Sequence, residues 1–65
     1  MLKVDVKGLR ESLGLTQVNF SQRYKIALGT LRQWEQGNRQ PEGPAQSYLL
    51  VIKEMPNEVA LALSK

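Results

Sequence analysis

The chain has 65 residues, with nine Lys and Arg against six Asp and Glu and a formal net charge of +3. This length predicts one small domain over residues 1–65, and the lack of Cys and His excludes disulfides, thiolate metal sites and imidazole catalysis. No apolar run approaches the roughly 18 residues of a membrane span, and the start shows no signal-peptide pattern, so we expect a cytoplasmic protein with no cofactor or metal.

The first predicted helix is short and amphipathic. Asp5 is a suitable N-cap, and Val6, Leu9 and Leu13 fall on one helical face. Gly14 stands where a C′ glycine ends such a helix.

A helix-turn-helix pattern follows over residues 17–36. Thr16 caps its first helix, which runs to about Arg23, and the next helix begins near Ala27 or Leu28 and ends at Gly37. The positions that such a motif constrains hold small or apolar residues: Phe20, Ser21, Tyr24, Ile26, Leu31 and Trp34. Base stacking and partner contact are alternatives for Trp34, but its spacing from Leu31 favours the core. The spacing is the one that a DNA-reading helix pair needs.

The C-terminal third predicts one or two further helices. Asn, Pro and Gly mark a loop over residues 38–43, and Pro44 opens a helix that Pro56 ends. One stripe of this helix faces the core: Ala45, Tyr48, Leu49 and Ile52. This helix has a second apolar flank, and a short final helix, Asn57 to Leu63, follows it. Together they carry more apolar surface than a small monomer can bury. We therefore expect a dimer interface within residues 44–63: Leu50, Val51, Met55, Val59 and Leu63. The fold class is all-α, with four to five short helices.

The positive charge is concentrated in the middle of the chain. Residues 21–40 hold four basic residues against Glu35, a net +3 that equals the charge of the whole chain. This is the footprint expected of phosphate contact, although a solvated basic face is the plain alternative. The candidate phosphate contacts are Gln17, Arg23, Lys25, Arg39 and Gln40. Arg23 and Lys25 near the turn could act only by steering, and Gln17 could be simply solvated.

The outward residues of the second helix of the motif are the candidate base readers: Leu28, Gly29, Thr30, Arg32 and Gln33. In the major groove, Arg32 can donate two bonds to guanine and Gln33 can pair with adenine. A phosphate contact remains the alternative for Arg32. Glycine inside a helix costs roughly 1 kcal/mol against alanine, so Gly29 either allows close approach to DNA or is tolerated at an exposed site.

The sequence resembles the Cro/C1-type (XRE) helix-turn-helix family, which has a lambda-repressor-like fold. The matching segments are Leu15-Thr16-Gln17, Phe20-Ser21, Gly29-Thr30-Leu31 and Trp34-Glu35-Gln36-Gly37. The continuation through Pro41 to Ala45 and the apolar C-terminal segments resemble HigA-type antitoxins of toxin–antitoxin operons. The resemblance implies a homodimer that binds inverted-repeat operator DNA, with Gln17 on a phosphate and Leu28, Gly29, Arg32 and Gln33 on bases. It also implies a pair between Arg10 and Glu35.

Three departures from the family pattern stand out. Lys25 occupies a turn position where the family usually has glycine, and Ala27 replaces the usual serine cap. HigA-like antitoxins often carry a further toxin-binding segment, whereas this chain begins close to its first helix, so the comparison leads us to expect either a shortened chain or a regulator without a toxin.

We therefore expect a sequence-specific transcriptional repressor that binds double-stranded DNA, most like an autoregulating antitoxin. The alternative is a protein-interaction module whose main role is binding and neutralising a toxin. An enzyme is not expected, because no His or Cys exists and neither converging carboxylates nor a nucleotide-binding loop is found.

Overall fold

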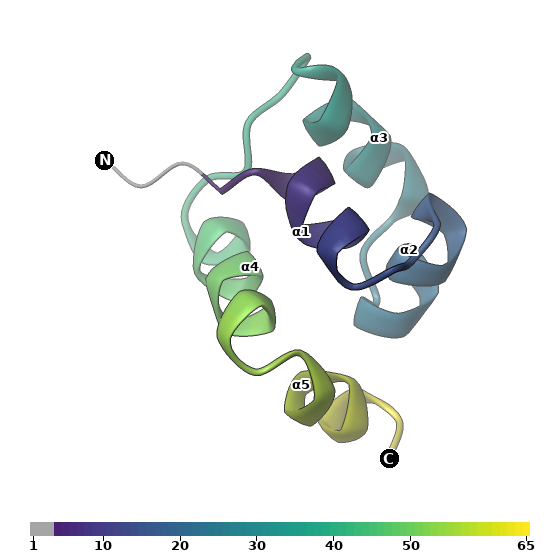
Figure 1. The fold of residues 1–65 in the computed structure, drawn as a ribbon. Helices are drawn as coiled ribbons and strands as arrows, with labels where there is room; N and C mark the ends of the chain where they lie inside the picture. Colours follow the sequence, from purple (N-terminus) through teal and green to yellow (C-terminus); the bar gives the residue numbers. More distant parts are fainter. Residues whose placement is uncertain (1–3) are drawn as a thin grey trace.

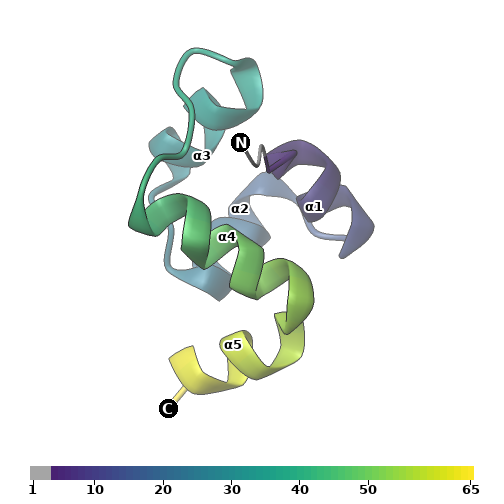
Figure 2. The ribbon, with the colours of Figure 1, turned by 90° about the vertical axis from the view of Figure 1, so that its left-hand side faces the viewer.

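Five helices and no strand make up residues 4–65, the part of the chain that the computed structural model describes (Figure 1). They are α1 (Val6–Ser12), α2 (Gln17–Tyr24), α3 (Leu28–Gln36), α4 (Pro44–Glu54) and α5 (Pro56–Leu63). The all-α prediction is confirmed, and the final helix begins at Pro56, one residue earlier than expected. In both ribbon views α5 lies at the opposite end of the molecule from the loop after α3 (Figures 1 and 2). None of the described helices is long and apolar enough to cross a membrane.

Local sequence sets the ends of the helices. The Asp5 side chain accepts a hydrogen bond from the Gly8 amide at 2.9 Å, and Thr16 Oγ accepts one from the Asn19 amide at 3.1 Å, so both predicted N-caps are confirmed. Ala27 stands at the N-cap of α3 and gives it no side-chain bond. Helix α3 ends at Gly37, which is left-handed with φ 80°.

The core is formed by eight apolar side chains from α1 to α4 and the turn before α3: Val6, Leu9, Phe20, Tyr24, Ile26, Leu31, Leu49 and Ile52. The rings of Phe20 and Tyr24 lie 5.0 Å apart between centroids and are tilted by 52°. Trp34 is half-buried and packs against this core, which confirms the core interpretation of that residue.

Two tyrosine hydroxyls tie α2 to the C-terminal helices. Tyr24 donates to the carbonyl of Pro56 at 2.9 Å, and Tyr48 donates to the carbonyl of Tyr24 at 2.6 Å. Burial raises the pKa of Tyr48 above its ordinary value. The helix pair α2–α3 is thereby fixed against a support made of α4 and α5.

The turn between α2 and α3 contains a lysine in the left-handed region. Lys25 has φ 58° and ψ 42°, a conformation that costs a side-chain-bearing residue about 1–2 kcal/mol. We expect Lys25→Gly to raise the free energy of unfolding by up to about 1 kcal/mol, because the lost strain exceeds the extra backbone entropy of glycine. Thermal unfolding should show a Tm rise of roughly 4–8 °C per kcal/mol.

The control is Gly37→Ala, which puts a Cβ into a similar left-handed conformation and should lower the Tm. A lower Tm for Lys25→Gly would show that the lysine side chain contributes more than the turn strain removes.

Candidate nucleic-acid interface

Helices α2 and α3 are locked together at their turn. The Ser21 hydroxyl donates a hydrogen bond to the Ile26 carbonyl, and the Ile26 amide donates to the Ser21 carbonyl at 3.0 Å. The Ile26 side chain is buried in the core between these bonds and α3. The small residue expected where the two helices meet is therefore also a hydrogen-bonding residue that fixes the start of α3.

Helix α3 has a buried inner side and a polar outer side. Leu31 is completely buried, whereas Gly29, Thr30, Arg32 and Gln33 are exposed. Leu28 is only half-buried, so less of it is available to a thymine methyl than expected. The exposure of the outer side matches the sequence prediction, and contact with bases stays a prediction. The candidate reading surface is the outer side of α3, made of Leu28, Gly29, Thr30, Arg32 and Gln33.

The glycine on the reading surface is not required by packing within the described protein. A Cβ built on Gly29 meets no atom within 4 Å, and its φ lies outside the left-handed range. Packing within the described residues therefore does not require glycine here, which leaves close approach to DNA and a tolerated exposed glycine as the two explanations.

A partly buried ion pair anchors α3 to α1. Arg10 Nε and Nη2 donate to the two carboxylate oxygens of Glu35 at 2.7 and 2.9 Å, and the side chains are only 12% and 4% exposed. Arg10 Nη1 also donates to the Leu15 carbonyl at 2.9 Å, just before α2. This bidentate geometry confirms the expected Arg10–Glu35 pair, and one guanidinium holds α1, the α1–α2 loop and α3 together.

Gln17, predicted to contact a phosphate, has two partners within the protein. Its Nε2 donates to Glu35 Oε1 at 3.2 Å, and its Oε1 accepts from Arg32 Nε at 3.4 Å. The side chain is half-buried at the start of α2, so it is not simply solvated. The structure thus brings a predicted phosphate contact and a predicted base reader into direct contact.

The ion pair makes the free energy of unfolding depend on pH. The hydrogen bonds from Arg10, followed by that from Gln17, hold the pKa of Glu35 below its ordinary value of 4.5. The stabilisation is complete above that value and is lost as the pH falls through the lower pKa of the folded state. We expect the free energy of unfolding to fall more steeply below pH 4.5 in the wild type than in Glu35→Gln, measured by urea unfolding between pH 7 and 3.

The remaining carboxylates are common to both proteins, so the difference between the two curves isolates Glu35. Parallel curves over this range would contradict the lowered pKa.

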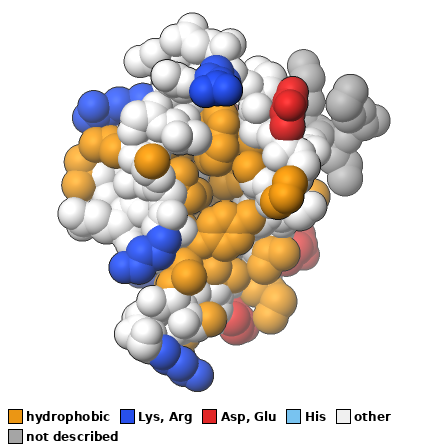
Figure 3. Space-filling model, turned by 180° about the vertical axis from the view of Figure 1, so that it is seen from behind, with side chains coloured by type: hydrophobic (Ala, Val, Ile, Leu, Met, Phe, Trp, Pro, Cys, Tyr) orange, Lys and Arg blue, Asp and Glu red, His pale blue; other side chains and the backbone are white. Residues whose placement is uncertain are grey.

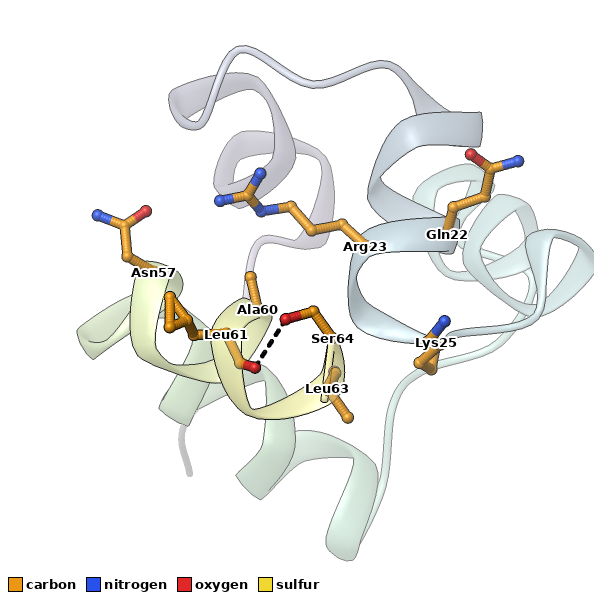
Figure 4. Close-up of a pocket in the computed structure, with 8 residues that line it drawn as sticks. All are labelled: Gln22, Arg23, Lys25, Asn57, Ala60, Leu61, Leu63 and Ser64. Atoms are coloured by element: carbon orange, nitrogen blue, oxygen red, sulfur yellow. Dashed lines mark hydrogen bonds between the residues drawn. The ribbon is translucent and has the colours of Figure 1, made fainter.

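The other predicted phosphate contacts lie in two places. Arg39 and Gln40 are exposed in the loop that follows α3. Arg23 and Lys25, in contrast, line an open groove of about 500 Å³ between the end of α2 and α5 (Figure 4). The Arg23 guanidinium also lies 5.9 Å from the centroid of the Tyr24 ring.

The C-terminal helices expose three large apolar side chains. Val51, Met55 and Leu61 are 47%, 48% and 61% exposed. Figure 3 shows that hydrophobic side chains reach the surface over the middle and lower part of one face of the molecule. Of the predicted interface residues, Leu50 is half-buried, and Val59 and Leu63 pack against the chain's own core. Val51 and Met55 are thus the predicted interface residues most available to a partner.

Sequence reasoning missed the contacts of the Gln17 side chain. Its bonds with Glu35 and Arg32 join residues 18 and 15 positions apart, and no periodicity reveals such pairs. Leu61 was also missed, because it lies off the stripe formed by Val59, Ala60 and Leu63. Within residues 4–65, the carboxylates form no group that could hold a metal ion.

Comparison with known proteins points to one relative. The chain is similar to a solved structure described as a crystal structure of an HTH XRE-family like protein from Agrobacterium tumefaciens. The two are 51% identical, and the match covers 91% of this chain and 95% of the other with a TM-score of 0.89. No family model and no curated protein matches the chain.

Proposed function

Since this chain belongs to the XRE family of helix-turn-helix proteins, we propose that it is a transcriptional repressor that binds an inverted-repeat DNA operator as a homodimer. We further propose that it serves as the autoregulating antitoxin of a toxin–antitoxin operon, which rests on the sequence resemblance to HigA-type antitoxins. The helix-turn-helix fold itself is a DNA-binding fold whose second helix enters the major groove.

The exposed outer side of α3 is the observation that carries the proposal. Its inner side is fixed by Leu31 and by the Glu35 carboxylate, so the polar side chains of the reading surface stand on a rigid element. Arg32 and Gln33 have the donor and acceptor groups that distinguish base pairs in the major groove. Arg39 lies exposed beyond the end of the helix, where it can add a phosphate contact.

The direct test is fluorescence anisotropy with the DNA upstream of the protein's own gene and a scrambled duplex, at about 150 mM salt. A preference of about a thousandfold is expected for a sequence-specific regulator. Equal and weak binding to both duplexes would contradict the proposal.

Two substitutions should separate base contact from phosphate contact. Gln33→Ala is expected to reduce discrimination at one base pair by about 1–3 kcal/mol, because the amide that pairs with adenine is lost. Arg39→Ala should instead weaken binding to every sequence alike and reduce the slope of log K against log salt by about one. Titrations of both variants against single-base-pair changes, at several salt concentrations, measure the two effects.

The base contact assigned to Gln33 and the phosphate contact assigned to Arg39 would be contradicted by different results. A uniform loss from Gln33→Ala would mean that this side chain contacts the backbone, and a loss confined to one base pair in Arg39→Ala would assign that arginine to a base. Both side chains are exposed, so neither change should alter the Tm.

A second candidate function is protein binding, with toxin neutralisation as the main activity. Val51, Met55 and Leu61 favour it, because three large apolar side chains of the C-terminal helices are left in solvent. Light scattering distinguishes the two proposals. A chain that stays monomeric at high concentration leaves this surface free for another protein, whereas a dimer supports the repressor.

A further inference from the structure

Four polar side chains form a continuous hydrogen-bonded series from the interior to the reading surface. Arg10 holds both oxygens of Glu35, Glu35 Oε1 accepts from Gln17, and Gln17 Oε1 accepts from Arg32. The series crosses α1, α3 and α2 and ends on the outer side of α3. From Glu35 outward the exposure rises, from a 4% exposed side chain through half-buried Gln17 to the exposed Arg32.

The buried carboxylate decides which way the Gln17 amide faces. An ionised carboxylate only accepts hydrogen bonds, so Gln17 must turn its NH₂ group toward Glu35. Its carbonyl oxygen then faces Arg32, where it accepts from Nε at 3.4 Å. A glutamate of ordinary pKa is already ionised at neutral pH, and the bonds from Arg10 and then Gln17 lower the pKa of Glu35 further.

Holding Arg32 through Nε leaves its two terminal nitrogens without a hydrogen bond to any of residues 4–65. The guanidinium is a planar fork, so fixing Nε restricts the directions in which Nη1 and Nη2 point. A guanine edge requires two parallel donors for O6 and N7. An arginine fixed at its stem loses less side-chain entropy when it forms those bonds than a freely rotating one.

We propose that Gln17 is a positioning residue for base recognition: oriented by Glu35, it holds the Arg32 guanidinium so that its two terminal nitrogens read one guanine. This inference rests on the proposed DNA binding and assigns the specificity of one base pair to a contact between α2 and α3. Gln17 thereby acts on sequence discrimination and not only on general affinity.

The test compares Gln17→Met, Arg32→Lys and the double variant on a duplex selected from a random library by the wild-type protein. Discrimination is measured against the same duplex with each base pair changed in turn. Arg32→Lys keeps the charge but loses the fork and should lower discrimination at one base pair about fivefold or more. Gln17→Met should lower discrimination at that same base pair, and the double variant should lose little more than Arg32→Lys alone.

Two further measurements separate positioning from general structure. Gln22→Met, the same change at an exposed glutamine near α5, should leave discrimination unchanged. In the free protein, Gln17→Met should shift the Arg32 Nε–H resonance in the NMR spectrum. Because the variant also loses the bond to Glu35, binding is compared at a temperature where every variant is fully folded.

Three results would overturn the inference. These are a loss from Gln17→Met that is equal for all duplexes, losses that multiply in the double variant, and an unshifted Arg32 resonance. In each case, a wild type that still prefers its selected duplex leaves the proposed function standing. A wild type with no preference for any duplex would contradict both the role of Gln17 and the proposed function.

Discussion

Replacing Arg10 by Met is expected to lower the free energy of unfolding by about 3–5 kcal/mol, the largest change for any single side chain of the interface. The variant leaves the Glu35 carboxylate, 4% exposed, without its cation, and the Leu15 carbonyl without its donor. A chain of this size has a total stability of only about 3–10 kcal/mol, so a substantial unfolded population is expected at 25 °C. Urea unfolding followed by the fluorescence of Trp34, the sole tryptophan, measures the change.

Two controls identify the ion pair as the cause. Arg23→Met removes an exposed arginine that stacks only on Tyr24, and should change stability by no more than about 0.5 kcal/mol. Arg10→Met combined with Glu35→Leu removes both charges and should recover most of the loss, because no unpaired charge stays buried. Additive losses in the double variant would contradict a coupled pair and would indicate that each side chain acts through other contacts.

Introducing Glu at both Val51 and Met55 is expected to reduce affinity for an inverted repeat by about a hundredfold or more. Both side chains are nearly half exposed in the single chain, so the change should not unfold it. At a two-fold interface, however, each new charge is brought near its own copy. In the proposed homodimer, breaking this interface removes the contribution of the second half-site, whose linkage is worth about 10²–10⁴ in affinity. Anisotropy on the full operator, together with sedimentation to measure the dimer, tests this expectation.

The matched control uses Lys at the same two positions. Lysine breaks a symmetric apolar interface as glutamate does but does not repel DNA, so a similar loss in both variants assigns the effect to dimerisation. A monomeric wild type, or a Glu variant that remains a dimer, would contradict the placement of the interface at Val51 and Met55, in α4 and at its C-cap.

Much of the fold follows from local signals in the sequence. Asp5, Thr16, Gly37 and Pro44 act on their own helix ends through the nearest few residues, and therefore they predicted the boundaries closely. Apolar spacing likewise predicted which side of α3 is buried, because a helix repeats every 3.6 residues whatever it packs against. The left-handed turn at Lys25 followed from the family pattern and from the tight connection between two helices.

The side-chain contacts of the candidate nucleic-acid interface could not be predicted from local sequence signals. Side chains such as Gln17 and Arg32 have several rotatable bonds, and which groups they meet depends on how α2 and α3 are placed in space. The packing of Val59 and Leu63 against the core, with Leu61 left in solvent, also depends on how α5 folds back toward α2.

The sequence by itself determined the helices, their caps, the buried side of the reading helix and the concentration of positive charge, because each depends on neighbouring residues or on composition. Only the tertiary structure decided that Glu35 is shared by Arg10 and Gln17, that Gln17 faces Arg32, and that Arg23 and Lys25 lie beside α5. These are contacts between separate helices. They depend on distance and orientation in space, which a one-dimensional pattern does not contain.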